Sequence, residues 1–228
     1  MSAPYAVSAI LFDLDGTLVD SIPDIHAALN QTLESLGEPP FTLDAVARMV
    51  GKGLPTTIER AYEALDKPLD PATRDRIVDR FRKIYTPRAT ELTTMNPGAS
   101  GATRALHEKG FRLGVVTNKP LAETMLILDH FGFTELMEVV VGGDAGPPKK
   151  PAPDLLILAC QRLGLEPTDV LLVGDSEYDV GAARAAGMPV LVLAGGYSRH
   201  SAEELGADVV LARLDEIEHH VRLPSAKG

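Results

Sequence analysis

The chain has 228 residues, of which 45% are hydrophobic and 24% charged, and its formal net charge is −10 at pH 7. This length suits one or two domains, and the composition is that of a globular protein, which excludes extensive disorder. The acidic balance leaves no broad basic face for a phosphate backbone, so we expect no nucleic-acid partner.

The ends and the cysteine content predict a cytoplasmic protein. The N-terminus lacks the basic and apolar regions of a signal peptide, and no apolar run approaches the length of about 20 residues that crosses a bilayer. We therefore expect no membrane partner. The single cysteine, Cys160, excludes an intrachain disulfide and occupies an apolar position of a helical pattern.

Five short apolar runs predict buried strands, at residues 8–12, 113–116, 138–141, 170–173 and 189–193. None alternates strictly between apolar and polar residues, which indicates burial on both faces, as in parallel sheets. Between them lie helical patterns, for example at 121–131 and 155–163. The alternation predicts an α/β fold with a doubly wound, mainly parallel sheet, whose ligands lie beyond the carboxyl ends of the strands.

One interval breaks this alternation, because residues 20–88 show helical patterns and no convincing strand. Helices are expected near residues 22–36, 43–50, 58–65 and 72–84. We predict that residues 1–18 and 89–228 form the α/β core and that residues 19–88 form an inserted, all-helical cap. Since the insertion follows the first strand directly, it should cover the carboxyl end of that strand like a lid. Packing of these helices directly on the sheet is the alternative.

The first predicted strand ends at two carboxylates, Asp13 and Asp15. Side chains two residues apart in an extended segment share one face, so these two carboxylates should converge. Like charges this close are unfavourable unless a cation or a shared proton compensates them. Gly16 allows a sharp turn after them, and Thr17 adds a hydroxyl at the same rim. The pattern predicts a chemical site.

Polar residues also follow three other predicted strands. They are Thr117 and Asn118 after the second strand, Lys149 and Lys150 beyond the third, and Asp175 and Asp179 after the fourth. Because carboxyl ends of parallel strands meet at one edge of the sheet, we expect these residues to surround a single site. Asp179 has three open roles: it would bind a metal, orient Lys150, or serve only as an acid favoured at a helix N-terminus.

These residue types suit phosphate chemistry. Asp13, Asp15 and Asp175 would supply hard oxygen ligands for Mg²⁺, which also takes a substrate phosphate. Thr117 would donate to a phosphoryl oxygen, and Lys150 would neutralise the charge of the nucleophile and the phosphate. Asp13 is then free to attack phosphorus, forming an aspartyl phosphate that water hydrolyses. Asp15 would protonate the leaving oxygen and later deprotonate the water.

The motifs resemble those of the haloacid dehalogenase superfamily, in its form with a helical cap, over nearly the whole chain. They are Asp13-Leu-Asp-Gly-Thr, a second motif ending at Thr117, Lys150-Pro-Ala-Pro, and Gly174-Asp175 with Asp179. The resemblance implies that Asp13 is the nucleophile and Asp15 the acid and base. It also implies Mg²⁺ bound by Asp13, the Asp15 backbone carbonyl and Asp175. Dehalogenases of this family lack the second aspartate, so Asp15 favours phosphoryl transfer.

Within this family the chain is most similar to phosphoglycolate phosphatases. The similarity lies in the segments 50–54, 117–119 and 142–151. It implies Mg²⁺-dependent hydrolysis of 2-phosphoglycolate, with Thr117, Asn118 and Lys150 at the phosphate. The substrate carboxylate would be read by Lys52 or by the backbone N–H groups of Gly51 and Gly53. Relatives usually carry Gly-Asn-Gly at this loop, and Lys52 replaces that Asn here, so the substrate stays open.

Other functions share parts of this pattern. A phosphatase for pyrophosphate or a sugar phosphate, and a phosphomutase, would use the same core chemistry. A phosphoaspartate receiver also gathers acids, a threonine and a lysine, but receivers are small single domains without an insertion. A non-catalytic binding protein is the remaining alternative. The sequence leaves monomer and homodimer open.

Overall fold

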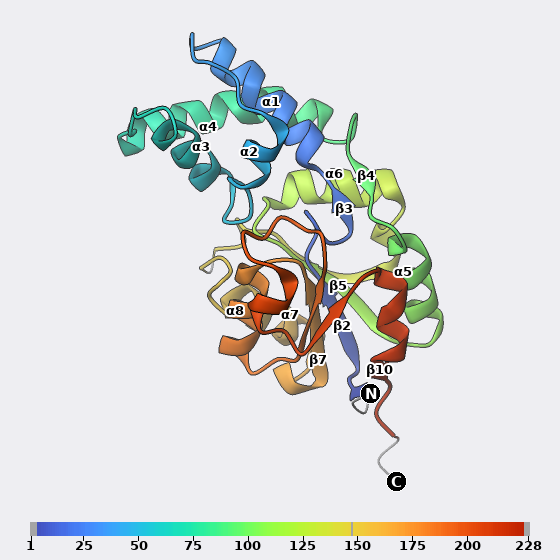
Figure 1. Ribbon diagram of the computed structural model, residues 1–228. Helices are drawn as coiled ribbons and strands as arrows, with labels where there is room; N and C mark the ends of the chain where they lie inside the picture. Colours follow the sequence, from blue (N-terminus) through green and yellow to red (C-terminus); the bar gives the residue numbers. More distant parts are fainter. Residues whose placement is uncertain (1–3, 147, 226–228) are drawn as a thin grey trace.

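The computed structural model describes residues 4–146 and 148–225; residues 1–3, 147 and 226–228, which belong to the predicted core range, lie outside the described residues. Its centre is a six-stranded parallel sheet with the strand order β6-β5-β2-β7-β8-β9 (Figure 1). The strands are β2 (Ala9–Phe12), β5 (Arg112–Val116), β6 (Met137–Val141), β7 (Val170–Gly174), β8 (Val190–Leu193) and β9 (Val209–Leu211). The order reverses at β2, and such a switch point is where ligands bind in open α/β sheets.

Helices cover both faces of the sheet. These helices are α5 (Ala99–Glu108), α6 (Leu121–Phe131), α7 (Asp154–Leu163) and α8 (Glu177–Ala186). Ile10 and Phe12 of β2 pack in one hydrophobic cluster with α5 and α6, whereas Ala9 and Leu11 pack in another with α7 and α8. This two-sided burial explains why the strands do not alternate in sequence, and it confirms the predicted α/β class.

The five predicted strands are confirmed as β2, β5, β6, β7 and β8, with bounds that differ by one residue at most. The strands that the sequence did not predict are β9, which has three residues, and two pairs of two-residue strands. These are β1 (Tyr5–Ala6) with β10 (Val221–Arg222), and β3 (Val19–Asp20) with β4 (Thr94–Met95). The expectation that residues 20–88 contain no strand was therefore wrong at Asp20, where β3 ends. Such short runs carry no readable periodicity.

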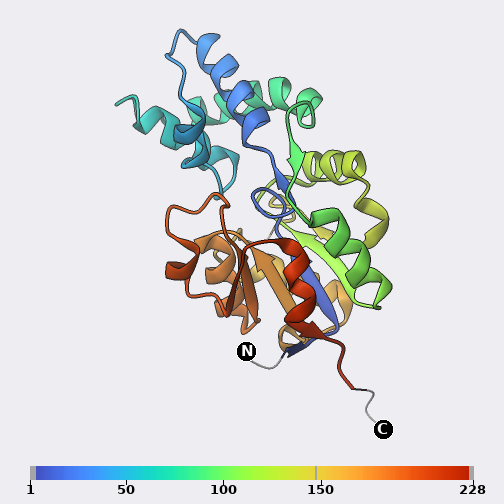
Figure 2. The same cartoon turned by 45° about the vertical axis from the view of Figure 1, so that its right-hand side comes forward.

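The insertion forms four helices that lie together beyond the carboxyl end of β2 (Figures 1 and 2). They are α1 (Ile22–Glu34), α2 (Leu43–Ala47), α3 (Leu54–Glu63) and α4 (Pro71–Tyr85). Leu29, Ile58 and Phe81 are buried in a hydrophobic cluster that includes no strand of the sheet. The helices therefore pack mainly on one another. This result argues against the alternative in which they pack directly on the sheet.

Local signals explain the helix ends. The Asp70 carboxylate accepts a hydrogen bond from Thr73 N at the start of α4, and Pro71 occupies the first turn, where its missing N–H costs nothing. Pro55 occupies the first turn of α3, which begins four residues before the predicted start. Short 3₁₀ helices complete the connections, at Thr86–Arg88, Thr134–Leu136, Pro167–Asp169, Ala202–Leu205 and Leu214–His219.

No helix among the described residues is both long enough and apolar enough for a membrane span. Cys160 is a buried free thiol in the cluster between α7 and the sheet, at the apolar helix position that the sequence predicts. Burial raises the pKa of its thiol to about 11, so the group stays a thiol at neutral pH.

Candidate active site

The loop after β2 brings the first aspartates to the carboxyl ends of the neighbouring strands. Gly16 adopts a left-handed φ of 87°, and a Cβ atom there would lie 2.4 Å from Asp175 Oδ2. Only glycine permits both this conformation and this close approach. Thr17 Oγ1 then donates a hydrogen bond to Asp175 Oδ1 at 3.0 Å, which joins the β2 loop to the end of β7.

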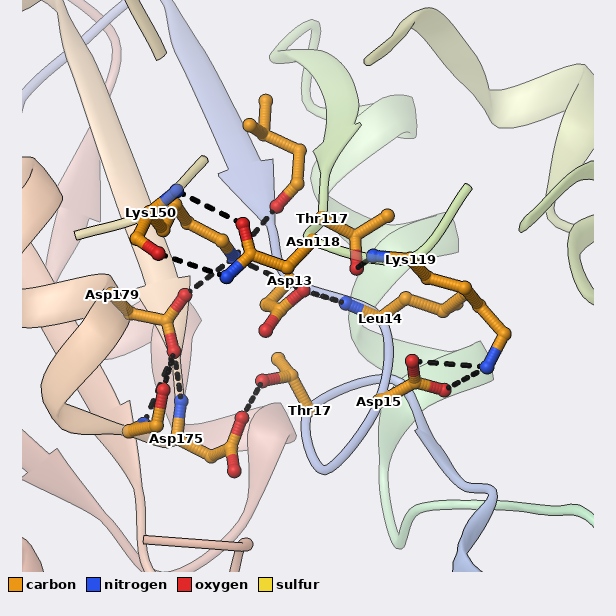
Figure 3. A network of polar contacts seen from close by, with 12 residues as sticks. Asp13, Leu14, Asp15, Thr17, Thr117, Asn118, Lys119, Lys150, Asp175 and Asp179 are labelled. Atoms are coloured by element: carbon orange, nitrogen blue, oxygen red, sulfur yellow. Dashed lines mark hydrogen bonds and ion pairs between the residues drawn. The ribbon is translucent and has the colours of Figure 1, made fainter. Parts of the chain in front are cut away.

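Asp13, Asp175 and Asp179 form a buried acidic cluster, in which one oxygen of each lies within 4.8 Å of the others (Figure 3). Burial raises the pKa of Asp13 to about 6; the Lys150 ammonium opposes this rise, and the neighbouring carboxylates of Asp179 and Asp15 add to it. Burial also raises the pKa of Asp175 well above its usual range, and repulsion from the Asp179 and Asp13 carboxylates adds to this rise. Buried oxygen ligands that repel one another in this way suit a hard divalent cation such as Mg²⁺.

Asp179 has no free oxygen in this cluster. Its Oδ1 accepts from Lys150 Nζ at 2.6 Å, and its Oδ2 accepts from Ser176 Oγ at 2.6 Å and from Ser176 N at 3.1 Å. Asp179 and Ser176 also form the capping box of α8. Of the three roles left open by the sequence, the contacts favour orientation of Lys150, together with capping of the helix.

Lys150 is fully buried beside the first aspartate. Its Nζ donates to Val116 O at 2.9 Å and lies 3.1 Å from Asp13 Oδ1. Burial by itself lowers the pKa of Lys150, but the carboxylates of Asp13 and Asp179 outweigh burial and raise this pKa above its usual value. The ammonium is therefore a fixed positive charge at the nucleophile predicted from the sequence.

Asn118 links three parts of the site. Its side-chain Nδ2 donates to Lys150 O at 3.0 Å and to Gly51 O, in the insertion, at 2.9 Å. Its Oδ1 accepts from Lys150 N at 2.9 Å. Both ends of the amide are thus occupied by main-chain groups, so Asn118 positions the Lys150 loop and the insertion loop. Thr117 lies at the end of β5, where its Oγ1 accepts from Lys119 N at 3.2 Å.

The carboxylate of Asp15 does not join the acidic cluster. Its two oxygens accept from Lys119 Nζ at 2.9 and 3.0 Å, and Oδ1 also accepts from Ser21 Oγ at 2.6 Å. Figure 3 shows this carboxylate directed away from Asp175. The Asp15 side chain, which the sequence predicts as a metal ligand, lies outside the acidic cluster, because the buried Lys119 ammonium holds it. Its backbone carbonyl stays a prediction as a ligand.

Lys119 is the residue that sequence reasoning missed. Its side chain is buried, and its Nζ lies 4.9 Å from the centroid of the Tyr85 ring, within range of a cation–π interaction. Burial lowers the pKa of Lys119, but the Asp15 carboxylate more than offsets this and raises it above the usual value. The available signal was its position two residues beyond Thr117, at the same strand end.

A cavity of about 70 Å³ lies between the sheet and the insertion. Core residues Asp13, Asp15, Thr117, Asn118 and Lys119 line it, as do Gly51, Gly53, Phe81 and Tyr85 of the insertion. Lys52 is exposed at the turn between the two glycines and does not line the cavity. The expectation that Lys52 reads the substrate is therefore not supported, because the turn leaves its side chain in solvent.

Comparison with known proteins defines the family first. Residues 10–193 match the model of the haloacid dehalogenase-like hydrolases, so the chain belongs to this family and the resemblance drawn from the motifs is confirmed. The chain is 40% identical over 208 residues to the phosphoglycolate phosphatase of Cereibacter sphaeroides, an alignment that covers 91% of this chain and 94% of the relative. It is 42% identical over 225 residues to that of Rhodospirillum rubrum, covering 96% and 93%.

A solved structure supports the same fold. The crystal structure of a predicted phosphoglycolate phosphatase from Haemophilus somnus matches with a TM-score of 0.88 and 30% sequence identity. The match covers 93% of this chain and 97% of that chain. The similarity thus extends over the sheet and the insertion alike.

Proposed function

We propose that the protein is a Mg²⁺-dependent phosphatase that hydrolyses 2-phosphoglycolate to glycolate and phosphate through a phosphoryl group held on Asp13. The observation that carries this proposal is the difference in contacts between the two oxygens of the Asp13 carboxylate. Its Oδ1 accepts from Leu14 N at 2.7 Å and lies 3.1 Å from Lys150 Nζ, whereas no described residue donates to its Oδ2. One oxygen is held and the other is free to attack phosphorus in the cavity that Asp13 lines.

In the first step, Asp13 Oδ2 bonds to phosphorus and the bond from phosphorus to the glycolate oxygen breaks. The electron pair of that bond leaves with the oxygen, which takes a proton from Asp15. In the second step, water attacks the phosphorus and gives its proton to Asp15. The bond from phosphorus to Asp13 then breaks, which restores the carboxylate and releases phosphate.

The other residues of the site bind the phosphoryl group. Thr117 Oγ1 accepts from a backbone N–H, which leaves its hydroxyl hydrogen to donate to a phosphoryl oxygen. Lys150, oriented by Asp179, supplies a fixed positive charge beside the nucleophile. The buried acidic cluster fits Mg²⁺, which Asp13, Asp175 and the Asp15 backbone carbonyl would hold. When bound there, Mg²⁺ supplies further positive charge to the phosphoryl oxygens.

The size of the cavity favours a small substrate. A volume of about 70 Å³ is well below the roughly 300–1,000 Å³ of pockets that bind drug-sized ligands. In this proposal the insertion acts as a cap, which closes over the substrate and excludes water. The two relatives that share 40% and 42% of their residues with this chain are phosphoglycolate phosphatases, which supports 2-phosphoglycolate as the substrate.

The test is phosphate release from 2-phosphoglycolate with Mg²⁺, measured beside pyrophosphate and several sugar phosphates, with a chelator as control. We expect 2-phosphoglycolate to lead by orders of magnitude in kcat/KM, and the chelator to abolish release. If another phosphate leads, the proposed substrate is wrong and the core mechanism stands. If the chelator has no effect, the proposed role of Mg²⁺ is wrong.

A further inference from the structure

The cavity contains one cation that the proposed chemistry does not use. Among the described residues, Lys119 is the single positively charged residue that lines it, whereas Asp13, Asp15 and Glu123 contribute negative charge. Lys52 is exposed, and Lys149 approaches Gly53 without lining the cavity. A second anionic group on the substrate therefore has one ammonium to bind inside the cavity.

We propose that Lys119 selects the substrate: its ammonium binds the substrate carboxylate and thereby releases Asp15. This inference rests on the proposed function, since it assigns Asp15 to proton transfer and 2-phosphoglycolate to the cavity. Lys119 holds both oxygens of Asp15, and Ser21 holds one of them as well. With both oxygens held, Asp15 faces Lys119 and not a leaving oxygen.

A substrate carboxylate is the chemical equivalent of the Asp15 side chain. It can make the same charge-assisted hydrogen bonds to the ammonium, so it can replace Asp15 there without leaving a buried charge unpaired. A phosphate ester without a carboxylate offers no such replacement. Binding of 2-phosphoglycolate would thus free Asp15 for proton transfer, and an analogue without the carboxylate would leave Asp15 paired with Lys119.

Tyr85 provides a second donor for the same carboxylate. Its side chain is buried, lines the cavity and places its ring against the Lys119 ammonium, while its hydroxyl hydrogen has no acceptor among the described residues. A buried hydroxyl hydrogen without an acceptor is unfavourable, and a carboxylate oxygen would accept it. Burial raises the pKa of Tyr85 to about 12, so the hydroxyl keeps its proton and can donate. Since Tyr85 belongs to α4, the bound carboxylate would also tie the insertion to the core.

The experiment compares 2-phosphoglycolate with 2-hydroxyethyl phosphate, in which a hydroxymethyl group replaces the carboxylate. The readout is the ratio of the two kcat/KM values, measured with Mg²⁺ for the wild type, Lys119→Met and Lys52→Met. We expect Lys119→Met to lower this ratio by about 100-fold or more, since a buried charge pair is lost with one substrate only. Lys52→Met should leave it within about twofold, because Lys52 is exposed.

Two further variants test the inference if Lys119→Met does not fold. Lys119→Arg retains the charge and should retain a preference for 2-phosphoglycolate. Tyr85→Phe removes only the hydroxyl and should raise the KM for 2-phosphoglycolate by about tenfold, with the KM for 2-hydroxyethyl phosphate little changed.

Three results would overturn the inference. In the first, Lys119→Met and Tyr85→Phe lower kcat/KM equally for both substrates, which is the behaviour of residues that only hold Asp15 or the fold in place. In the second, Lys52→Met alone removes the preference. In the third, the wild type shows no preference for 2-phosphoglycolate; this outcome refutes the proposed substrate itself, whereas the first two refute the role of Lys119 and leave that substrate intact.

Discussion

The α/β core and the helical insertion each have a hydrophobic core of their own, but they contribute different groups to the cavity. The core contributes a buried network of charged side chains, in which Lys150 and Asp179 hold each other beside Asp13. The insertion contributes glycines, apolar side chains, Thr57 and Tyr85. The sheet therefore sets the charges for the proposed phosphoryl transfer, while the insertion shapes the cavity that the substrate would enter.

The boundary between the two regions is crossed by polar contacts. Asn118 Nδ2 donates to Gly51 O, and an Arg60 guanidinium nitrogen donates to the hydroxyl of Tyr178 at 2.8 Å. None of the hydrophobic clusters among the described residues contains both insertion helices and sheet strands. Separate hydrophobic cores are what the proposed closing cap would require, because the two regions would then move relative to each other as units.

The largest expected effect comes from breaking the core chemistry. Asp13→Asn replaces the attacking carboxylate oxygen by a group that cannot attack phosphorus, so kcat should fall by roughly 10⁴-fold or more. Circular dichroism should show an intact fold. The matched control is Asp79→Asn, the same change on an exposed part of α4, which should leave turnover unchanged. Near-normal turnover by Asp13→Asn would rule out covalent catalysis through this residue.

The second prediction concerns the buried charge network. Lys150→Met removes the ammonium from Asp13 and Asp179, so the free energy of unfolding in chelator should fall by about 3–5 kcal/mol. Lys67→Met, which breaks the exposed pair with Glu38, should lower it by less than about 1 kcal/mol. Urea unfolding measures both values. Equal effects of the two substitutions would show that the network contributes no more than a surface ion pair.

The third prediction tests whether the two hydrophobic cores are separate. Leu172→Ala in β7 and Leu29→Ala in α1 each remove a fully buried side chain. Each should lower the free energy of unfolding of its own region by about 2–5 kcal/mol. Hydrogen exchange should show lost protection across the sheet for Leu172→Ala, but only in α1 to α4 for Leu29→Ala. Loss of protection throughout the chain in both variants would mean that the two regions unfold as one.

The smallest expected effect is the pH dependence of metal binding to the core. Because the pKa of Asp13 is raised to about 6, the metal-free protein should lose stability as pH rises from about 4 through 6, where this buried carboxyl ionises. Mg²⁺ should therefore raise Tm more at pH 7.5 than at pH 5. At pH 5 the Asp13 carboxyl is mostly protonated, and Mg²⁺ must displace that proton to bind. At a Mg²⁺ concentration of 100 times its Kd, the free energy of unfolding should rise by about 2.7 kcal/mol. An equal rise in Tm at both pH values would place the metal elsewhere.

Sequence patterns predicted the central strands of the sheet but not the shortest strands. The apolar runs of β2, β5 and β7 were readable because burial on both faces leaves a continuous signal. The three residues of β9 and the pair of β3 and β4 carry too few side chains for a pattern, and pairing with a neighbouring strand is what stabilises them. Local sequence cannot contain that information.

The site residues likewise divide into those that the strand order places and those that depend on tertiary contacts. Asp13 and Asp175 directly follow the neighbouring strands β2 and β7, so parallel topology brings them together. Lys150 lies further beyond β6, and the Asn118 amide holds its main chain at the site. The pairing of Lys119 with Asp15 depends on side-chain conformations at two different strand ends, which no spacing reveals. The role predicted for Lys52 depended on how the insertion loop lies on the core, and the structure leaves that lysine in solvent.

Covalent catalysis by Asp13 is tested most directly by trapping the phosphoryl group on its carboxylate. The wild type would be mixed with 2-phosphoglycolate and Mg²⁺, quenched in acid within milliseconds, and treated with borohydride, which reduces an aspartyl phosphate to homoserine. Mass spectrometry of the peptides should then find homoserine at position 13, and none in the absence of substrate. Homoserine in place of another aspartate, or an unchanged Asp13 while phosphate is being released, would show that Asp13 is not the nucleophile.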